Sequence, residues 1–166
     1  SKVSDIIITT GGASVGDADY IKSALRKVGE VNFWKIAIKP GRPLAHGKIK
    51  NSLFFGLPGN PVSAAVTFQI FIMPAIRKIL QMPDSSKLTI KAQVKSTLSK
   101  KKGRIEYKRG LLEQKDGVNI VSTTGLQGSN ILSSLSKANC YIRLSSETEK
   151  IKKGDIVEVI PFDINL

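Results

Sequence analysis

The chain has 166 residues and carries 26 Lys and Arg against 13 Asp and Glu, which gives a net charge of +13. Its length allows one ordinary domain or two small ones, and 41% hydrophobic residues can fill a core. The single Cys140 excludes an internal disulfide, and no signal peptide is evident, so we expect a cytoplasmic protein.

The first 82 residues alternate between strand-like and helix-like patterns. A buried strand is predicted at Ile6 to Thr10, followed by a helix from Ala18 to Val28. Further strands are predicted at Val31 to Lys39 and Phe54 to Gly56, and a long helix from Pro61 to Gln81. This alternation predicts an α/β domain with a parallel sheet over residues 1–82.

The long helix 61–81 is strongly apolar but does not have the pattern of a membrane span. Its polar positions are Ser63, Thr67 and Gln69, and Pro74 is expected to kink it. Its uninterrupted apolar stretch is shorter than the roughly 20 residues that a span needs. We therefore expect a core or subunit-interface helix and no membrane partner.

Residues 83–166 change to a pattern of short alternating strands separated by turns. Five strands are predicted, at residues 88–94, 105–107, 118–121, 140–144 and 156–160. Five short strands in about 80 residues are typical of a small all-β barrel or sandwich. The chain is thus predicted to be an α/β piece followed by an all-β piece, with the boundary between 82 and 83.

The positive charge by itself would suit a nucleic-acid partner, because Lys and Arg neutralise phosphates. Residues 1–82 carry 11 basic and 4 acidic residues, or +7, and residues 83–166 carry 15 and 9, or +6, so neither half concentrates the charge. Aromatic residues are only 6%, and no nucleic-acid motif appears. We expect no nucleic-acid partner, since an anionic small molecule accounts for the charge equally well.

Three glycine-containing loops follow the predicted strands. In the first, Gly11, Gly12, Ser14 and Gly16 form a small loop whose backbone N–H groups could hold a phosphate or another oxyanion, and Asp19 follows. The glycine spacing does not match the dinucleotide-binding pattern. An ordinary strand-to-helix turn, with Asp19 as its N-cap, remains the alternative.

The second and third loops bring further candidates. Lys35 and Lys39 are four residues apart on one predicted strand, and a turn at Pro40-Gly41 should bring Lys39 near Arg42. A solvated basic edge is the alternative for these cations. In the third loop, Gly59 permits close backbone approach, and Asn60 before a proline is a strong helix start. Three such loops suggest one shared pocket.

Five stretches in this order resemble one protein family. They are "TTGGASVGDADY", "FWKIAIKPGRPLAHGKI", "FFGLPGNPVSAAVTF", "KGRIEYKRGLL" and "STTGLQGSNILSSLSKANCYIRL". Together they are similar to the C-terminal portion of the molybdopterin molybdenumtransferases, of the bacterial MoeA type with gephyrin E domains as animal relatives. The resemblance covers essentially the whole chain and implies a homodimeric enzyme of molybdenum cofactor biosynthesis.

The implied reaction inserts molybdate into adenylylated molybdopterin, with release of AMP and assistance from Mg²⁺. By resemblance, Asp19 is the metal-binding and catalytic acid, and Lys35 and Lys39 are catalytic. The molybdopterin and its phosphate would be held by Gly11, Gly12, Ser14, Gly16, Gly59 and Asn60. Molybdate would be bound by Lys39, Arg42, Arg104 and Ser129, although Arg104 and Ser129 also fit exposed hairpin and loop positions.

The resemblance also leaves alternatives open. The family's enzyme has upstream segments with further acidic site residues, so this chain is expected to be a fragment of it. Arg42 replaces a lysine common at that position, which keeps the charge but changes the donor geometry. A non-catalytic scaffold or peptide-binding module of the gephyrin type is the main alternative function, and a basic nucleic-acid-binding module is the second.

Overall fold

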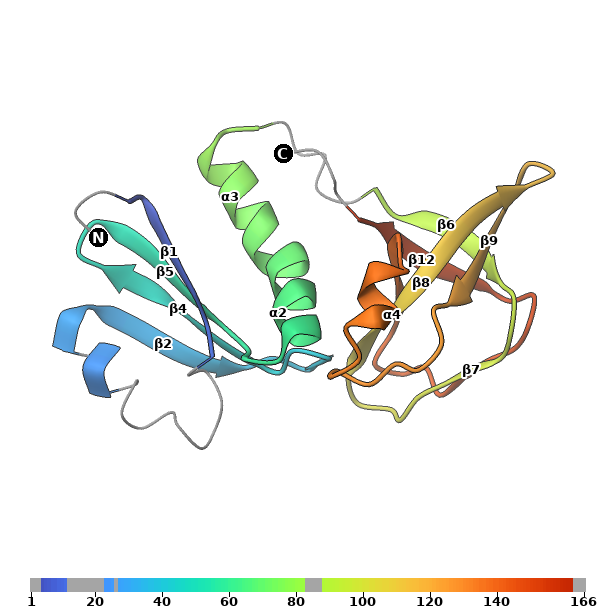
Figure 1. Ribbon diagram of the computed structural model, residues 1–166, viewed down its shortest axis with the longest axis horizontal. Coiled ribbons are helices and arrows are strands. Elements are labelled where there is room, and N and C mark those ends of the chain that lie inside the picture. The colour runs from blue at the N-terminus through green and yellow to red at the C-terminus, as the bar shows by residue number, and fades with distance from the viewer. Residues whose placement is uncertain (1–3, 12–22, 26, 83–87, 163–166) are drawn as a thin grey trace. The chain divides into compact units, whose positions relative to one another are not determined.

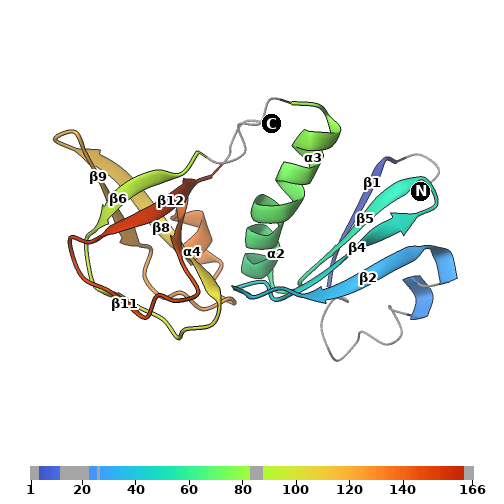
Figure 2. The ribbon, with the colours of Figure 1, turned by 180° about the vertical axis from the view of Figure 1, so that it is seen from behind.

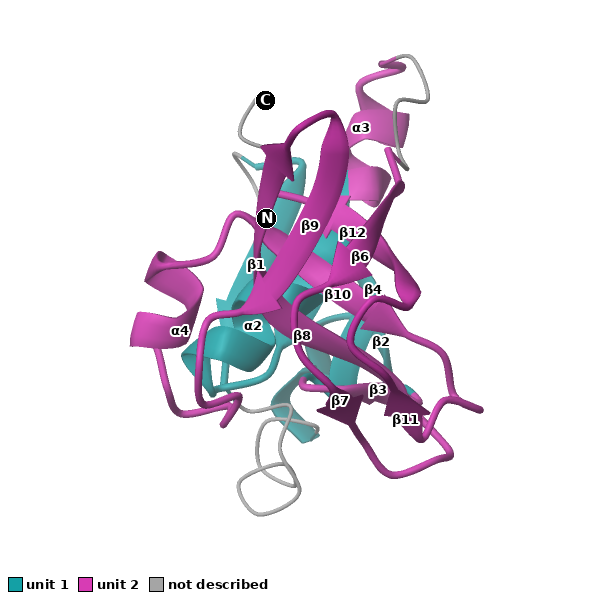
Figure 3. Ribbon diagram, turned by 90° about the vertical axis from the view of Figure 1, so that its right-hand side faces the viewer, with its two compact units in different colours: residues 1–36, 41–73 teal, residues 37–40, 74–166 magenta. Residues whose placement is uncertain are grey.

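A computed structural model describes residues 4–11, 23–25, 27–82 and 88–162 of the chain. The chain divides into two compact units, coloured separately in Figure 3. The first comprises residues 1–36 and 41–73, and the second comprises residues 37–40 and 74–166. Residues 37–40 therefore belong to the second unit although they lie early in the chain, and the predicted boundary between 82 and 83 stays a prediction.

The first unit is built on a four-stranded sheet (Figure 1). Its strands, in spatial order, are β1 (Ile6–Thr10), β5 (Ser52–Leu57), β4 (Pro43–Ile49) and β2 (Glu30–Lys35). β1 runs parallel to β5, whereas β4 is antiparallel to both of its neighbours. The described sheet is therefore mixed, where the sequence predicted a parallel one.

The antiparallel part of the sheet has a local cause. Ile49 pairs with Ser52, which leaves Lys50 and Asn51 as a two-residue connection between β4 and β5. Lys50 adopts a φ of 53°, in the left-handed region that tight hairpin turns require. A connection this short can join only antiparallel strands, because a parallel pair needs a crossover of a dozen or more residues.

One face of this sheet is covered by a small apolar core. Val31, Ala45 and Phe54 are buried on it, and Ile7 and Leu25 pack against them. Leu25 lies in a helical stretch, since residues 23–25 and 27–28 are helical. These positions agree with the last part of the predicted helix 18–28, whose residues 18–22 and 26 lie outside the described residues.

The predicted helix 61–81 forms as three consecutive segments: α2 (Pro61–Thr67), a π-helical segment η1 (Phe68–Ile72) and α3 (Met73–Ile79). In an α-helix, Pro74 would lack the N–H that bonds to residue 70, and its ring would crowd that carbonyl. Just before the proline, the Met73 N–H donates to the Phe68 carbonyl, five residues back. This change of hydrogen-bond register precedes Pro74, and the helix continues through it.

By length and apolar composition alone, residues Pro61–Ile79 would suffice to cross a membrane. Core helices of soluble proteins have the same two properties. Val62, Val66 and Ile72 are fully buried within the protein, as is the polar Thr67. The expectation of a core or interface helix stays a prediction.

The second unit contains a closed five-stranded barrel (Figure 2), as the sequence predicted for this half. Around the barrel the strands are β10 (Cys140–Leu144), β12 (Ile156–Pro161), β6 (Ile90–Val94), β9 (Val118–Thr123) and β8 (Ile105–Lys115). The β8–β10 pairing closes the ring. Alternate residues point inward and form one apolar core, which includes Val94, Val121, Ile142 and Val159.

The strand β8 pairs with three other strands, two of which belong to the barrel. It pairs with the two-residue β3 (Ile38–Lys39) at its start, with β10 up to Gly110, and with β9 from Gly110 onward. The strands β7 (Leu98–Ser99) and β11 (Lys150–Ile151) pair as a separate two-stranded sheet whose Leu98 and Ile151 pack into the barrel core, and the short helix α4 (Ser133–Ser136) precedes β10. β8 therefore brings the early residues 38 and 39 against the barrel.

Candidate functional site

Two of the three glycine loops meet at one edge of the first unit's sheet. Gly11 follows β1 directly, and its N–H donates to the Leu57 carbonyl at the end of β5, at 3.1 Å. A Cβ added to Gly59 would lie 3.3 Å from the Gly11 Cα, so the two backbones approach closely and a side chain at position 59 would be crowded. The loops after these parallel strands thus lie side by side at their carboxyl ends, where α/β proteins commonly bind ligands.

Several predicted loop residues lie outside the described part of the chain. They are Gly12, Ser14, Gly16 and Asp19. Gly11 has a φ of 88°, which favours glycine at that position. The predicted phosphate loop therefore begins where a side chain would be strained, next to Gly59.

Asn60 has a local structural role. It lies at the N-cap of α2 with an extended backbone, and its side-chain oxygen accepts a hydrogen bond from the Ser63 N–H at 3.4 Å. Pro61 follows at the first helical position. This geometry is that of a helix start, and it accounts for Asn60 without any ligand.

The predicted strand 31–39 is interrupted, which separates its two lysines. β2 ends at Lys35, and residues 38 and 39 form β3 in the second unit. Lys35 is exposed at the end of β2 and pairs with Pro43, while the Ile36 N–H donates to the Arg42 carbonyl. The prediction that Lys35 and Lys39 share one strand face is wrong, because β2 and β3 are different strands. Arg42 is exposed in the first unit.

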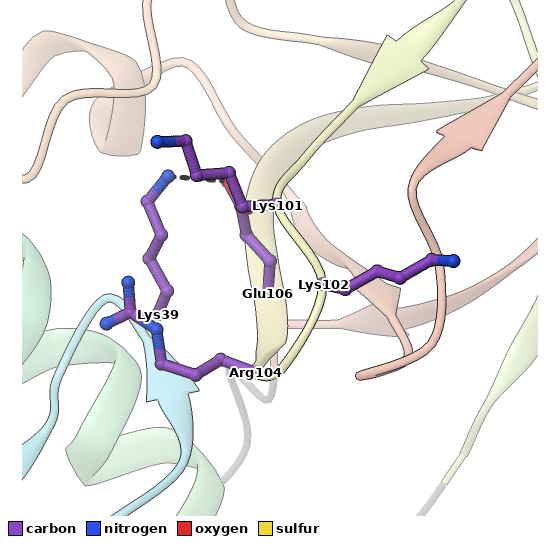
Figure 4. Close-up of a pocket in the computed structure, with 5 residues that line it drawn as sticks. All are labelled: Lys39, Lys101, Lys102, Arg104 and Glu106. Carbon is purple, nitrogen blue, oxygen red and sulfur yellow. Dashed lines mark ion pairs between the residues drawn. The ribbon is translucent and has the colours of Figure 1, made fainter.

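Lys39 instead contributes to a cationic pocket on the second unit (Figure 4). The pocket measures about 60 Å³ and is lined by Lys39, Lys101, Lys102, Arg104 and Glu106. This volume is several times the roughly 10–15 Å³ that one water molecule needs, so a small tetrahedral anion fits. Lys39 and Arg104, both predicted molybdate ligands, therefore do lie at one site.

The charges of the pocket favour an anion. Its four cations and one carboxylate sum to +3. Lys39 Nζ lies 3.4 Å from Glu106 Oε1, and Lys108 Nζ lies 3.1 Å from the same oxygen. Figure 4 shows the ammonium groups of Lys39 and Lys101 on the side of the Glu106 carboxylate, with the Lys102 side chain directed away. Several donors thus remain to bind an incoming oxyanion.

Ser129, the fourth predicted molybdate ligand, does not line this pocket. It is exposed in the loop between β9 and α4. Arg109, which is 1% exposed, holds both that loop and α4: its Nη2 donates to the Gly128 carbonyl of the loop and its Nε to Ser134 Oγ of α4, both at 3.0 Å. The Gln127 side chain bonds the Arg109 backbone on both sides, accepting from its N–H and donating to its carbonyl.

Burial changes the ionisation of Arg109 and of its neighbour Tyr141. Desolvation lowers the pKa of Arg109, and it raises the pKa of Tyr141, whose charged form the nearby guanidinium favours. No acidic side chain is bonded to Arg109 in the contacts of the described residues, which are carbonyls, a hydroxyl and an amide. The loop that carries Ser129 is therefore held by polar bonds to one buried cation.

Sequence reasoning missed five residues of this region: Lys101, Lys102, Glu106, Lys108 and Arg109. The lysine run 100–102 has the composition of a solvated turn. The charged residues Glu106 and Lys108 alternate on a strand at positions where core residues are expected, and that pattern was the available signal.

The described residues do not form a site for Mg²⁺. Among residues 4–11, 23–25, 27–82 and 88–162, no three His, Cys, Asp or Glu side chains gather where a metal ion could bind. Glu106 is already engaged by two lysines. A magnesium site would thus depend on Asp19, outside the described residues.

Comparisons with known proteins identify both halves of the chain. Residues 1–78 match the family described as "Probable molybdopterin binding domain", and residues 91–162 match the MoeA C-terminal region, domain IV. The chain is 45% identical to a molybdopterin molybdenumtransferase of Haemophilus influenzae over 161 residues, which is 96% of the chain and 40% of that protein. It is 35% identical to gephyrin of Dictyostelium discoideum, with 96% of the chain and 26% of that protein covered.

A solved structure agrees with these matches. The crystal structure of the molybdopterin biosynthesis MoeA protein from Pyrococcus horikoshii superposes with a TM-score of 0.77 at 27% identity, covering 98% of the chain and 38% of that protein. The chain therefore spans about 40% or less of the length of these relatives. In both of its matched domains and along nearly its whole length, the chain is therefore similar to the MoeA and gephyrin proteins.

Proposed function

We propose that the chain acts in molybdenum cofactor biosynthesis, as part of a transferase that inserts molybdate into adenylylated molybdopterin and releases AMP. The observation that carries the proposal is the 45% identity to a molybdopterin molybdenumtransferase over 96% of the chain, across both units. The cationic pocket with Lys39 and Arg104 supports it, because molybdate is a tetrahedral dianion.

The residues would divide the chemistry between them. The adjoining Gly11 and Gly59 loops would receive the pterin phosphate, since backbone N–H groups at a strand end bind oxyanions. Lys39 and Arg104 would attract molybdate. Negative charge builds on phosphate oxygens as the pyrophosphate bond breaks, and Lys35 and Lys39 would stabilise it. Arg42 and Ser129 stay predicted molybdate ligands by resemblance, and neither lines the cationic pocket.

Three further features belong to this proposal. Mg²⁺ would be held by Asp19 and would offset charge on the phosphates when bound. The protein would work as a homodimer in the cytoplasm.

Replacing Asp19 by Asn should weaken Mg²⁺-dependent binding of adenylylated molybdopterin. The melting temperature should stay the same, because Asn is a comparable N-cap.

A titration tests the proposal directly. The chain should bind molybdopterin or its adenylylated form in a calorimeter, and Lys39→Met should weaken binding of molybdate without lowering the melting temperature. Failure of the wild-type chain to bind molybdopterin, adenylylated molybdopterin or molybdate would contradict the proposed function.

The similarity to a gephyrin supports a second candidate, a non-catalytic scaffold that binds a peptide. Such a scaffold does not need the cationic pocket. A partner peptide that binds wild type and Lys39→Met equally, in a chain that does not bind molybdopterin, would favour the scaffold.

A further inference from the structure

Glu106 is a buried carboxylate inside an otherwise cationic pocket, and the proposed function gives it no role. The residue is 4% exposed, and its Oε1 contacts the ammonium groups of both Lys39 and Lys108. The three side chains form an ion triad around one oxygen. The Lys108 side chain is 12% exposed, whereas the Lys39 side chain is 52% exposed at the pocket.

The position of the triad in the barrel is unusual for charged residues. Glu106 pairs directly with Leu144, and Lys108 pairs directly with Ile142, across the β8–β10 ladder. Directly paired residues share one face of a sheet, and Ile142 and Leu144 belong to the barrel core. A charge placed on such a face is unfavourable unless it is paired, and an apolar pair would stabilise the barrel at least as well. The triad therefore needs an explanation other than stability.

The pairing of β3 with β8 explains why charged residues lie here. Lys39 pairs directly with Glu106 across the parallel β3–β8 ladder, and the neighbouring Ile38 is 3% exposed. The backbone of Lys39 is therefore anchored, while its long, half-exposed side chain would be free to rotate without a partner. Ordering a lysine side chain is unfavourable because it loses rotamer freedom. The fixed Glu106 carboxylate orders the Lys39 side chain before an anion binds.

We propose that Glu106, itself held by Lys108, is a positioning residue that holds the Lys39 ammonium in place for an oxyanion bound in the pocket. The inference rests on the proposed function, because it requires the pocket to bind an anion. Glu106 does not touch the anion in this arrangement. It acts through Lys39.

The competing role for Glu106 is simple neutralisation of the neighbouring cations. The two roles predict opposite changes in anion affinity when the carboxylate is removed. Glu106→Gln raises the pocket charge from +3 to +4. If the carboxylate only neutralises charge, this change strengthens anion binding. If it positions Lys39, binding weakens although the pocket becomes more positive.

The test is a calorimetric titration of the 166-residue chain with tungstate, a molybdate analogue, at fixed ionic strength. We expect the dissociation constant to rise about tenfold in Glu106→Gln, a loss of about 1.4 kcal/mol. Glu106→Asp keeps the charge but shortens the side chain, so it should also weaken binding. The matched control is Glu149→Gln, which makes the same change of charge at an exposed carboxylate 3.7 Å from Lys102 and should leave binding unchanged or slightly stronger.

A second measurement follows Lys39 without any anion. The rate at which an amine-acylating reagent modifies Lys39, measured by mass spectrometry, should rise in both Glu106 variants and stay constant in Glu149→Gln. Thermal melts verify that each variant is folded. If Glu106→Gln does not fold, the tungstate affinity of Glu106→Asp tests the positioning role by itself.

Each outcome separates the inference from the function on which it rests. If wild type binds tungstate and the folded Glu106 variants bind it equally well or more tightly, the positioning role is overturned and the pocket stands. If wild type does not bind tungstate, the anion pocket itself is overturned, and the positioning role with it.

Discussion

In the second unit, two buried cationic side chains bond to backbone carbonyls of its loops. Arg109 bonds both the Gly128 carbonyl in the loop after β9 and Ser134 Oγ of α4, and Lys100, which is 9% exposed, donates to the Ser146 and Thr148 carbonyls, at 3.2 and 2.9 Å. Both cations bind carbonyl oxygens of loops that have no regular structure. Such bonds order loops whose backbone groups would otherwise face water.

Cys140 provides a residue-scale prediction about ionisation. Its thiol is fully buried, and burial raises the pKa to about 12 from an ordinary 9.0. A raised pKa means that the folded state favours the protonated thiol, so this stabilisation is complete below about pH 9 and is lost as the pH rises toward 12. The free energy of unfolding of wild type, minus that of Cys140→Val, should therefore fall over this range in urea titrations.

The subtraction removes the titration of lysines and tyrosines that both proteins share. A difference that stays constant or rises with pH would contradict the assigned burial. Thiol reagents offer a second check, since they should label Cys140 at pH 8 only after denaturant is added.

At the scale of elements, β8 depends on a glycine where it changes partners. Gly110 pairs with Cys140 of β10 and with Thr123 of β9. A Cβ there would lie 2.9 Å from both Cys140 Sγ and Ile142 Cγ1 and 3.1 Å from Val121 Cγ2. The three partners belong to the closely packed barrel core, so they have little room to move.

Gly110→Ala should therefore destabilise the chain by about 1–3 kcal/mol through overpacking, measured by urea unfolding. The Gly110→Ala/Cys140→Ala double variant removes one of the crowding atoms and should be less destabilised than the sum of the two single variants. Strict additivity, or a Gly110→Ala variant as stable as wild type, would show that the core accommodates the methyl group.

Elements with a strong local pattern could be predicted, and those fixed by distant contacts could not. The runs Ile6–Thr10 and Cys140–Leu144 are strands at their predicted bounds, because each is rich in β-branched, aromatic and other apolar residues. The strand Pro43–Ile49 was missed, since its proline and glycine interrupt the pattern. β3 has only two residues, and its pairing with β8, 67 positions later in the register, is a tertiary contact that no local periodicity reveals.

The same limit applies to the candidate site. Lys39 and Arg104 were named from the resemblance, and the structure places both at the cationic pocket. Glu106 could not be assigned to the pocket from the sequence, because its role depends on the register between β3 and β8. The predicted Lys35–Lys39 pair failed because the chain leaves one sheet after Lys35 and enters another at Ile38.

At the scale of the whole molecule, the apolar helix 61–79 is relevant to assembly. Ile79 at its end and Leu80 directly after it are 44% and 61% exposed, although other positions of the helix are fully buried. Apolar side chains on a long helix favour burial against a partner surface. Light scattering at high micromolar concentration should give the mass of a dimer, twice 18.0 kDa, and a strict monomer would contradict the proposed homodimer.

The cationic pocket of the second unit is proposed to bind a tetrahedral oxyanion. The most direct measurement is a crystal structure of the chain soaked in tungstate, whose heavy atom is unambiguous in anomalous density. We predict that bound tungstate contacts Lys39 and Arg104. Tungstate bound elsewhere, in contact with none of Lys39, Arg42, Arg104 and Ser129, would contradict this assignment of the anion site.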